Sequence, residues 1–329
     1  MDIVSPDIDR RLMDGWQRDL PLVPRPFAVI ARALGLQEDE VISRLGRLRE
    51  AGKVSRVGGT CRPNTAGAST LAAVAAPDGR IEDVAAAIGG LDGVNHSYLR
   101  ENAWNIWFVA TGPDRAHVDA TLDAVRRRTG LEVLDLPLVR PFNVDLGFRL
   151  DGEGPAPRAR DADLDALIEG DRPILQALSE GLEITARPYG ALARSLGRDE
   201  SDIIGRIGAL LEAGLIGRLG VIVRHRSLGW TSNAMVVWNV PEDRIVAAGE
   251  TLRAERGVTL CYQRRPAARF WPYNLYCMIH ARSRDEALDT LQRAEAAAAL
   301  GGLPRRILFS LRCFKQKGAL VAVKEGAAA

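Results

Sequence analysis

The segment Glu38-Asp-Glu-Val-Ile-Ser-Arg-Leu-Gly-Arg-Leu-Arg-Glu-Ala-Gly-Lys-Val-Ser-Arg-Val-Gly58 recurs as Glu200-Ser-Asp-Ile-Ile-Gly-Arg-Ile-Gly-Ala-Leu-Leu-Glu-Ala-Gly-Leu-Ile-Gly-Arg-Leu-Gly220. With the residues that precede it, the repeat spans positions 25–58 and 187–220, which share 16 identities in 34 ungapped positions. Average residue usage would give roughly two. The chain therefore contains two copies of one ancestral unit.

Each copy begins with a pattern of three short helices. In the first copy apolar residues recur at helical spacing, and Gly35 and Gly52 end the second and third helices. The alternation in Gly52–Gly58 predicts a small hairpin or wing. This order is typical of a winged helix-turn-helix domain. The expected helices are Asp9–Arg18, Pro26–Leu34 and Glu38–Glu50.

The remainder of each copy alternates strand and helix patterns. In the first copy the order is β-α-β-β-α-β, which predicts a ferredoxin-like sandwich and an α+β fold class for the chain. The expected elements are a strand at Thr70–Ala76, a helix at Ile81–Ile88, a hairpin strand near Val94–Leu99, a strand at Tyr98–Thr111, a helix at Ala116–Arg128 and a terminal strand near Asn143–Phe148.

These patterns predict six segments. They are a winged helix-turn-helix domain at 1–60, a ferredoxin-like domain at 61–150, a linker at 151–163, a second winged helix-turn-helix domain at 164–221, a second ferredoxin-like domain at 222–319 and a tail at 320–329. The stretch Asp151–Asp161 is rich in Pro, Gly and charge, as linkers are. It is long enough for the two ferredoxin-like domains to pair with each other.

Composition favours a soluble cytoplasmic protein. The chain has 329 residues, 47% of them apolar, and a net charge of +2 from 44 basic and 42 acidic residues, so no overall field would hold a nucleic acid. Its four cysteines lie far apart without a C-x-x-C spacing, which indicates neither a disulfide framework nor a zinc site. No apolar run approaches membrane-spanning length, and the N-terminal residues are charged.

A second repeated stretch marks the candidate site. His96-Ser-Tyr-Leu-Arg-Glu-Asn-Ala-Trp-Asn-Ile-Trp-Phe108 returns as Cys261-Tyr-Gln-Arg-Arg-Pro-Ala-Ala-Arg-Phe-Trp-Pro-Tyr-Asn-Leu-Tyr-Cys277, with five extra residues, Pro266–Phe270, in the second copy. Both place Tyr and Arg two residues apart before an aromatic-Asn-aliphatic-aromatic run. Polar groups where a strand meets a loop are typical of ligand sites.

A winged helix followed by a ferredoxin-like sandwich resembles the Lrp/AsnC regulators. The two site stretches, together with Arg224–Trp238, Asp145–Phe148 and Leu308–Lys317, resemble the siroheme decarboxylases, and this resemblance runs through most of the chain. Each half resembles one of the two unlike subunits of that family. The chain is therefore similar to the fused form associated with heme d1 synthesis.

The resemblance implies an enzyme that removes CO₂ from the C12 and C18 acetate groups of siroheme and gives didecarboxysiroheme. It implies no metal site and no cofactor beyond the iron of the substrate. The implied partners are siroheme and the other half of the chain, with a homo-oligomer or further decarboxylase subunits as open alternatives. Asn102 stands where one subunit type has a second histidine, which puts a role for that imidazole in doubt.

The candidate catalytic residues are His96, His225 and Tyr98. Loss of CO₂ needs a general acid, and an imidazole titrates near neutral pH. His96 is the preferred acid. His225, between two arginines, could be an acid, an iron ligand or a carboxylate contact, and Tyr98 a polar contact. For each histidine a core or loop role is the alternative, and His280 and His117 are expected to be structural.

The candidate substrate-binding residues are those that could bind carboxylates or stack on a macrocycle. Siroheme carries eight carboxylates, and arginine forks bind planar anions in bidentate fashion. The arginines compete with solvated surface roles, the aromatics with ordinary core roles, and the asparagines with a bonded bulge. The set comprises Arg100, Arg224, Arg226, Tyr262, Arg264, Arg265, Trp271, Asn105 and Asn274, with Lys315 and Lys317 as further cations.

Two other functions compete with the enzyme. A DNA-binding regulator would need basic or amide groups on the third helix of each winged domain. The first copy offers Arg44 and Arg47, whereas the second offers Asp202, Gly205, Arg206 and Ala209, which makes DNA binding unlikely. A non-catalytic tetrapyrrole carrier or sensor would bind siroheme without converting it.

Overall fold

The computed structural model describes residues 6–144, 147, 162–267 and 269–322. They form two compact units, each with its own packing. The helical unit is Met1–Ala66 with Arg160–Leu228, and the barrel unit is Gly67–Ala159 with Gly229–Ala329. Each unit therefore combines equivalent segments from both copies of the repeat.

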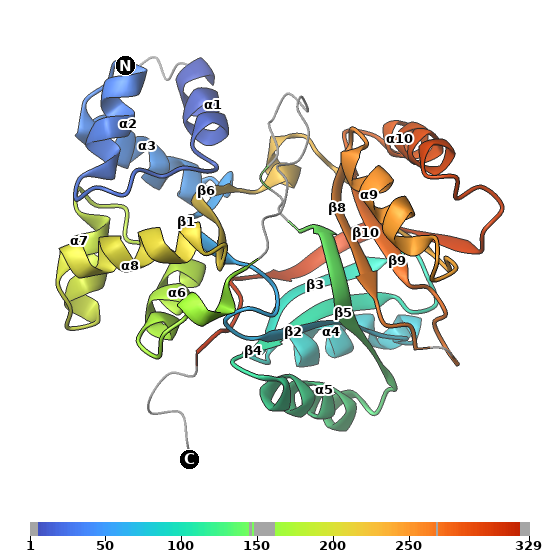
Figure 1. The fold of residues 1–329 in the computed structure, drawn as a ribbon. Coiled ribbons are helices and arrows are strands. Elements are labelled where there is room, and N and C mark those ends of the chain that lie inside the picture. Colours follow the sequence, from blue (N-terminus) through green and yellow to red (C-terminus); the bar gives the residue numbers. More distant parts are fainter. Residues whose placement is uncertain (1–5, 145–146, 148–161, 268, 323–329) are drawn as a thin grey trace. The chain divides into compact units, whose positions relative to one another are not determined.

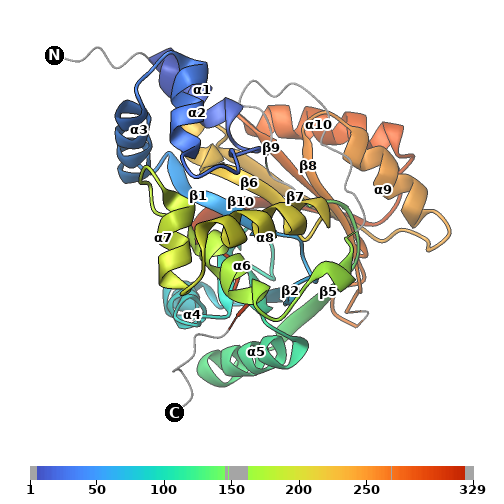
Figure 2. The same ribbon diagram turned by 60° about the vertical axis from the view of Figure 1, so that its left-hand side comes forward.

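The helical unit contains the two helix-turn-helix segments (Figures 1 and 2). Pro26 and Pro188 occupy the first turns of equivalent helices, where a missing N–H costs nothing, and Gly35 ends its helix with φ of 71°. The elements are α1 (Pro6–Gly15), α2 (Pro26–Leu34), α3 (Glu38–Glu50), β1 (Val54–Cys61), η2 (Leu164–Ala166), α6 (Asp171–Glu180), α7 (Pro188–Ser195), α8 (Glu200–Glu212), β6 (Ile216–Val223) and η3 (His225–Leu228).

Strands β1 and β6 pair with each other and not with strands of their own copies. The pairing is antiparallel, and Gly58 lies opposite Gly220. The prediction of a local hairpin at Gly52–Gly58 is therefore wrong. The sequence pattern gave the alternation of a strand correctly, but its partner lies in the other half of the chain.

Gly58 and Gly220, which are paired in this ribbon, are each in close contact with the backbone of another segment. A Cβ on Gly58 would lie 2.3 Å from the Leu178 carbonyl oxygen, and one on Gly220 would lie 2.4 Å from the Gln17 backbone. Both contacts are far too close for a methyl group. The ribbon thus needs glycine at these positions because backbone packs directly on backbone.

The Gly220→Ala change is expected to destabilise the protein by about 1–3 kcal/mol, since the Gln17 backbone must move to admit the methyl group. Thermal unfolding measures the effect. Gly205→Ala is the matched control, because a Cβ at this helical position meets nothing within 4 Å and alanine favours a helix over glycine by roughly 1 kcal/mol. Equal melting temperatures for the Gly220→Ala and parental proteins would contradict the packing argument.

The barrel unit contains two β-α-β-β-α-β segments (Figures 1 and 2). Its strands close in the order β10-β3-β4-β2-β5-β8-β9-β7. The first segment comprises β2 (Ala68–Val74), η1 (Asp78–Arg80), α4 (Ile81–Gly89), β3 (Val94–Arg100), β4 (Ile106–Gly112), α5 (Arg115–Thr129) and β5 (Val133–Asn143). The second comprises β7 (Ser232–Trp238), α9 (Ile245–Ala254), β8 (Val258–Arg264), β9 (Leu275–Ala281), α10 (Arg284–Ala297) and β10 (Arg305–Gln316).

The last strand of each half joins the two sheets. One end of β5 pairs with β2 of its own half, and the other end pairs with β8. In the same way β10 pairs with β7 and with β3. The expected pairing of the two ferredoxin-like segments within one chain is confirmed, and it takes place by exchange of long strands.

Three apolar clusters fill the barrel unit. Two of them lie between the sheet of one half and its own helices. The third draws on both halves, with Leu71, Trp107 and Leu134 from the first and Met235, Tyr262 and Tyr276 from the second, and it lies on the inner face of the barrel strands. Any polar group on this interior face is therefore enclosed by both halves.

Several expected boundaries differ from those observed. The helices at Pro26–Leu34 and Glu38–Glu50 are confirmed, whereas the strand expected at Tyr98–Thr111 is two strands separated by a turn. The terminal strand expected at Asn143–Phe148 lies at Val133–Asn143. The linker 151–161, most of 144–148 and the tail after residue 322 lie outside the described residues. No helix in the described ranges is long and apolar enough to cross a membrane.

A cut within Asp151–Asp161 is expected to leave the two halves associated at micromolar concentration. The pairings β5–β8, β10–β3 and β1–β6 all join one half to the other without using the linker. Size-exclusion chromatography of the cut and uncut chains measures association. Elution of separate halves under native conditions would contradict the observed pairing.

Candidate functional site

Strand β3 presents alternate side chains to the barrel interior. Tyr98 lies opposite Trp107 of the interior cluster in the β3–β4 pairing. Because side chains alternate along a strand, His96 and Arg100 share this face, and Leu99 faces the helices. The sequence motif thus places an imidazole, a phenol and a guanidinium in one row.

Strand β8 presents the equivalent row from the second half. Tyr262 and Tyr276 are opposite each other in the β8–β9 pairing, and their rings stack with centroids 6.0 Å apart. Arg264 shares the face of Tyr262. Leu260, which packs against the interior cluster, occupies the place that His96 holds in the first half.

The Arg100 guanidinium is buried, with 5% of the residue exposed. Its Nη1 donates to the Leu308 carbonyl oxygen at 3.1 Å and to Asn233 Oδ1 at 3.4 Å, and its Cζ lies 5.6 Å from the centre of the Tyr98 ring. Burial lowers the pKa of Arg100 to about 10, which leaves it charged at neutral pH. The group is a cation in a low-dielectric interior.

Arg264 repeats this arrangement from the other half. Its Nη1 donates to the Leu136 carbonyl oxygen at 2.8 Å, and its Cζ lies 4.6 Å from the centre of the Tyr262 ring. Burial lowers the pKa of Arg264 and raises that of Tyr262. Each arginine therefore reaches the backbone of the opposite half and lies over the tyrosine two residues before it.

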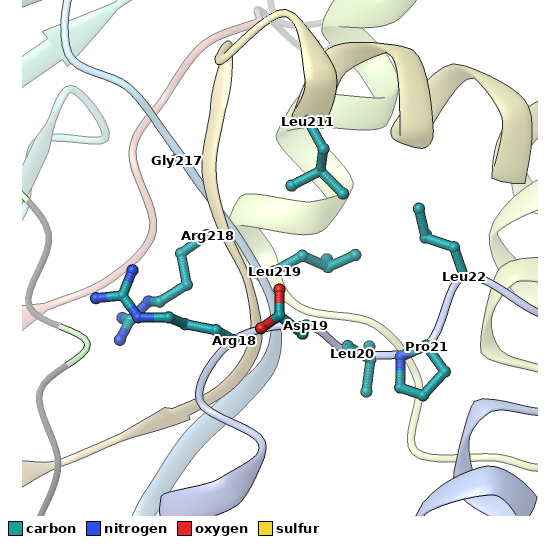
Figure 3. Close-up of a pocket in the computed structure, with 9 residues that line it drawn as sticks. All are labelled: Arg18, Asp19, Leu20, Pro21, Leu22, Leu211, Gly217, Arg218 and Leu219. Atoms are coloured by element: carbon teal, nitrogen blue, oxygen red, sulfur yellow. The ribbon is translucent and has the colours of Figure 1, made fainter. Parts of the chain in front are cut away.

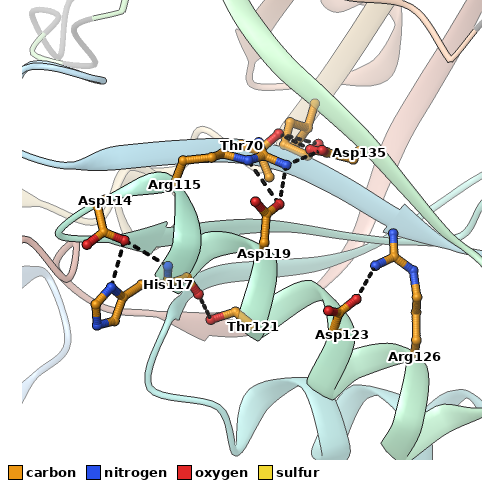
Figure 4. Close-up of polar contacts among 10 residues, drawn as sticks. Thr70, Asp114, Arg115, His117, Asp119, Thr121, Asp123, Arg126 and Asp135 are labelled. Atoms are coloured by element: carbon orange, nitrogen blue, oxygen red, sulfur yellow. Dashed lines mark hydrogen bonds and ion pairs between the residues drawn. The ribbon is translucent and has the colours of Figure 1, made fainter.

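Neither guanidinium has a carboxylate partner in the described part of the chain. The negative charge of Asp135 offsets a small part of the pKa lowering that burial causes at Arg264. The Asp135 carboxylate itself is bound by Arg115 and by the Thr70 hydroxyl (Figure 4). Arg115 is in turn held by Asp119 at 2.6 Å. The Asp135 and Asp119 carboxylates are therefore paired with Arg115 and not with Arg264.

Each of the two arginines also keeps a buried Nε–H without a hydrogen-bond partner. A buried charge is costly unless it is paired, and an unmade hydrogen bond adds to that cost. Arg100 and Arg264 are therefore two enclosed donors that lack an anion. Carboxylates of a ligand would supply the missing partners.

His96 is held beside this row. Its Nδ1 lies 3.3 Å from Tyr98 Oη, and the two rings are 6.2 Å apart. Both residues are half-buried, so the imidazole is in contact with the interior without being sealed in the core. The geometry allows Tyr98 to orient the His96 imidazole.

Trp271 forms part of the wall of the interior. Its indole N–H donates to Tyr276 Oη at 2.9 Å, and its ring packs edge-on against Trp107 and Tyr273 at 5.1 and 4.9 Å. These contacts are those of a core aromatic. Arg265 is exposed, and Phe270 of the inserted segment lies on the surface, where it meets Trp104 edge-on at 6.4 Å.

Asn105 and Asn274 clamp backbone in the same way in the two halves. Asn105 Oδ1 accepts from the Ala76 N–H at 2.9 Å and Nδ2 donates to the Ala76 carbonyl at 2.8 Å. Asn274 makes the same two bonds with Val240 at the same distances. The bonded alternative explains these residues, so we do not propose them as substrate contacts.

Arg224, His225 and Arg226 belong to the helical unit, where they follow β6. Both arginines are exposed. Their place in the site remains a prediction. Lys315 has a structural role, since its Nζ donates to the Gly89 and Leu91 carbonyl oxygens, both at 2.7 Å, at the end of α4.

Three polar residues of the second half were not selected from the sequence. Asn233, Thr259 and His280 form a bonded group that reaches Arg100. Alternation along Leu275–Ala281 puts His280 on the same face as Tyr276 and Met278, which belong to the interior cluster. The two-residue spacing of Tyr276, Met278 and His280 in the sequence could have indicated that His280 faces the interior. By contrast, His117 is structural as expected, because Asp114 caps its helix (Figure 4).

The helical unit has a cavity of about 370 Å³ (Figure 3). Arg18, Asp19 and Arg218 line one side, and Leu211 and Leu219 line another. This volume is near the lower end for drug-sized ligands, which is small for a tetrapyrrole with eight carboxylates. In the described ranges, no group of three or more His, Cys, Asp or Glu side chains is placed to hold a metal ion.

The third helices of the helix-turn-helix segments offer little to DNA. Arg44 pairs with Asp9 at 2.9 Å, and the equivalent Arg206 pairs with Asp171 at 2.6 Å. These pairs tie each third helix to the first helix of its own segment. Two of the basic groups that a regulator would direct at phosphates are thus engaged in ion pairs, and the exposed Arg47 has Ala209 as its counterpart in the second copy.

Comparison with known proteins identifies both parts of the chain. A family model for the AsnC-like ligand binding domain matches residues 66–143 and 227–315, and one for the siroheme decarboxylase NirDL-like HTH domain matches residues 9–54 and 171–216. The fold and the site thus define a protein of the AsnC-like ligand-binding class with a duplicated domain.

Individual relatives narrow this class. The siroheme decarboxylase NirDL subunit of Paracoccus denitrificans is 57% identical over 317 residues, which cover 96% of this chain and 98% of the relative. The siroheme decarboxylase NirD subunit of Stutzerimonas stutzeri is 49% identical over 143 residues, or 44% of this chain and 94% of the relative.

A solved structure agrees with these relatives. The crystal structure of siroheme decarboxylase NirDL in complex with an iron-uroporphyrin III analogue has a TM-score of 0.66 at 26% identity and covers 95% of this chain and 93% of that one. The chain belongs to the siroheme decarboxylase family. It is a decarboxylase, and the resemblance inferred from the sequence is confirmed.

Proposed function

We propose that the enzyme removes CO₂ from the C12 and C18 acetate groups of siroheme in the barrel interior, in the heme d1 pathway. The observation that carries this proposal is the pair of guanidinium groups of Arg100, which is buried, and Arg264, which is half-buried with a buried Nε; they come one from each half, and both lack a carboxylate partner among the described residues. A polycarboxylate ligand would supply both counter-ions. A hydrogen bond to a charged group contributes about 1.5–3 kcal/mol.

His96 acts as the general acid in this proposal. Cleavage of the bond between the acetate methylene and its carboxylate releases CO₂ and leaves the electron pair on the methylene carbon, where the conjugated ring can share it. A proton from His96 then gives the methyl group. Tyr98, within 3.3 Å of Nδ1, orients the imidazole for this transfer.

Strand β8 of the second half has no imidazole at the place equivalent to His96, and His280 of β9 is engaged with Asn233 and Thr259. Leu260 takes the equivalent place in the second half, where it packs against the interior cluster. We therefore place both decarboxylations beside His96, one after the other, with Arg264 as an anchor for a distant carboxylate. Arg265, Tyr262 and Trp271 are proposed as the rim and wall of the binding site, and Arg224, Arg226 and His225 of the helical unit stay carboxylate contacts predicted from the sequence.

Anaerobic incubation of the purified protein with siroheme, followed by mass spectrometry of the tetrapyrrole, tests the proposal. The expected product has lost the mass of two CO₂ molecules. Heat-treated protein is the control. An unchanged tetrapyrrole that co-purifies with the protein would indicate a carrier, and an absorption spectrum unaffected by siroheme would exclude a tetrapyrrole protein.

We place the enzyme in the reducing cytoplasm. Its four cysteines, Cys61, Cys261, Cys277 and Cys313, are free thiols in the structure. Cys261 and Cys277 lie opposite each other on paired strands, and burial raises the pKa of both thiols. Thiols in such surroundings are unreactive. Cell fractionation followed by immunodetection of the protein tests the location, with recovery in the cytoplasmic fraction as the expected result.

A further inference from the structure

A polar group in the barrel interior lies next to Arg100 but outside the proposed catalytic residues. Asn233 Nδ2 is 2.7 Å from His280 Nε2, and His280 Nδ1 is 2.7 Å from Thr259 Oγ1. Asn233 Oδ1 accepts from Arg100 Nη1 at 3.4 Å, and Thr259 Oγ1 donates to the Met278 carbonyl oxygen at 3.1 Å. The group thus runs from a guanidinium to a backbone carbonyl.

The two ends of this group determine the direction of every hydrogen bond in it. Arg100 can only donate, so Asn233 must turn Oδ1 towards it and Nδ2 towards His280. Nε2 of His280 then accepts. At the other end the Met278 carbonyl takes the Thr259 hydroxyl proton, so His280 Nδ1 must donate to Thr259 Oγ1. With these directions His280 accepts at Nε2 and donates at Nδ1.

We infer that His280 is a positioning residue that, through Asn233, holds the Arg100 guanidinium in the orientation that binds a substrate carboxylate. This inference rests on the proposed function. It identifies the residue that orients Arg100, one of the two arginines proposed to bind substrate carboxylates. Without an acceptor at His280 Nε2, no hydrogen bond holds the Asn233 amide in the orientation that directs Oδ1 at Arg100. The guanidinium then keeps only its bond to the Leu308 carbonyl and contacts with Tyr98 and Met278.

The equivalent positions in the first half have different partners. Ser69 and Thr111 pair across strands as Asn233 and His280 do. Thr111 Oγ1 donates to the Gly93 carbonyl at 3.3 Å and accepts from the Leu320 N–H at 3.0 Å, which are backbone contacts. In the part of the chain that the structure describes, the bonded Asn-His-Thr group lies beside Arg100, on whose strand His96 also lies.

A double-mutant cycle tests the inference with iron uroporphyrin III as the probe, titrated by its absorption spectrum. The proteins are the parent, His280→Leu, Arg100→Met and the double variant. We expect His280→Leu to weaken binding about tenfold in the parent and less than twofold in the Arg100→Met background, since coupled residues in one network are not additive. Equal losses in both backgrounds would overturn the inference.

Conservative variants separate positioning from packing. His280→Gln keeps an acceptor for the Asn233 amide and is expected to bind the probe within about threefold of the parent. Thr259→Val removes the partner of Nδ1 with little change of shape, and it is expected to weaken binding severalfold even if His280→Leu fails to fold. A Gln variant as weak as the Leu variant would contradict the assigned hydrogen-bond directions.

Further measurements separate this inference from the proposed function. His117→Leu, at an exposed helix start, is the control histidine and should bind as the parent does. Probe binding does not require turnover. If the parent binds the probe without releasing CO₂ from siroheme, the proposed function fails while the cycle can still succeed. If the parent releases CO₂ and the cycle shows no coupling, only the role of His280 is lost.

Discussion

In the His96→Ala protein, CO₂ release from bound siroheme is expected to be about 10²–10⁴-fold slower than in the parent, which is the usual contribution of a general acid. Siroheme binding is expected to change little, because the carboxylates are held by arginines and His96 is only half-buried beside Tyr98. Single-turnover measurement of product by mass spectrometry, with saturating enzyme, isolates the chemical step from binding.

His117→Ala is the matched control for this change. His117 lies at the exposed start of α5, where Asp114 caps the helix (Figure 4), and its removal should leave the rate at the parental value. A parental rate in the His96→Ala protein would remove His96 from the mechanism. His225 would then be the next histidine to test, because it lies between Arg224 and Arg226.

The Arg264→Met protein is expected to bind siroheme roughly ten- to a hundredfold more weakly, since a charge-assisted hydrogen bond contributes about 1.5–3 kcal/mol. The ligand-free protein is expected to keep its melting temperature or to gain a few degrees. Burial of an unpaired cation costs several kcal/mol, and even the partial burial of Arg264 offsets the value of its bond to the Leu136 carbonyl. Titration and thermal unfolding measure the two effects separately.

Arg126→Met provides the comparison for Arg264→Met. Arg126 is exposed on α5 and pairs with Asp123 at 2.7 Å (Figure 4), and such surface pairs contribute little. Its loss should change neither affinity nor melting temperature. If Arg264→Met lowered stability as much as affinity, the arginine would be a structural residue of the barrel and not an anion site.

The sequence predicted helix boundaries correctly where residues within one helical turn of the boundary determine it. The helix Pro26–Leu34 follows from proline in its first turn and Gly35 after its last residue. The helix Glu38–Glu50 follows from acidic residues in its first turn and from Gly52 just beyond its end. The Tyr-Arg spacing in both halves likewise places each pair on one strand face. These predictions needed no knowledge of distant contacts.

The last strand of the first half shows where local signals fail. Val133–Asn143 contains Pro137 and Pro141, which argue against a strand because proline cannot donate to a ladder. The strand tolerates them because it changes partners from β2 to β8 and carries register shifts at Leu138/Arg140 and Pro141/Asn143. A strand shared between two sheets cannot be recognised from one copy alone.

The site was predicted only in part for a similar reason. Arg100 and Arg264 were selected, but His280 was set aside because no residue near it in sequence suggested a ligand. Its partners Asn233 and Thr259 are 47 and 21 residues away, and it reaches Arg100 through the closure of the barrel. For Asn105 and Asn274, which were also selected from the sequence, the structure gives a different reason for the repeated placement, namely a shared backbone clamp.

Closure of the barrel also bears on how the enzyme can be produced. Every strand in it has a neighbour on both sides, so the assembled unit offers no free sheet edge to another chain. A half synthesised alone would leave β3 or β8 uncovered, and an uncovered strand is a template for aggregation. Synthesis of both halves as one polypeptide fixes their stoichiometry at one to one, so that each edge always has its complement.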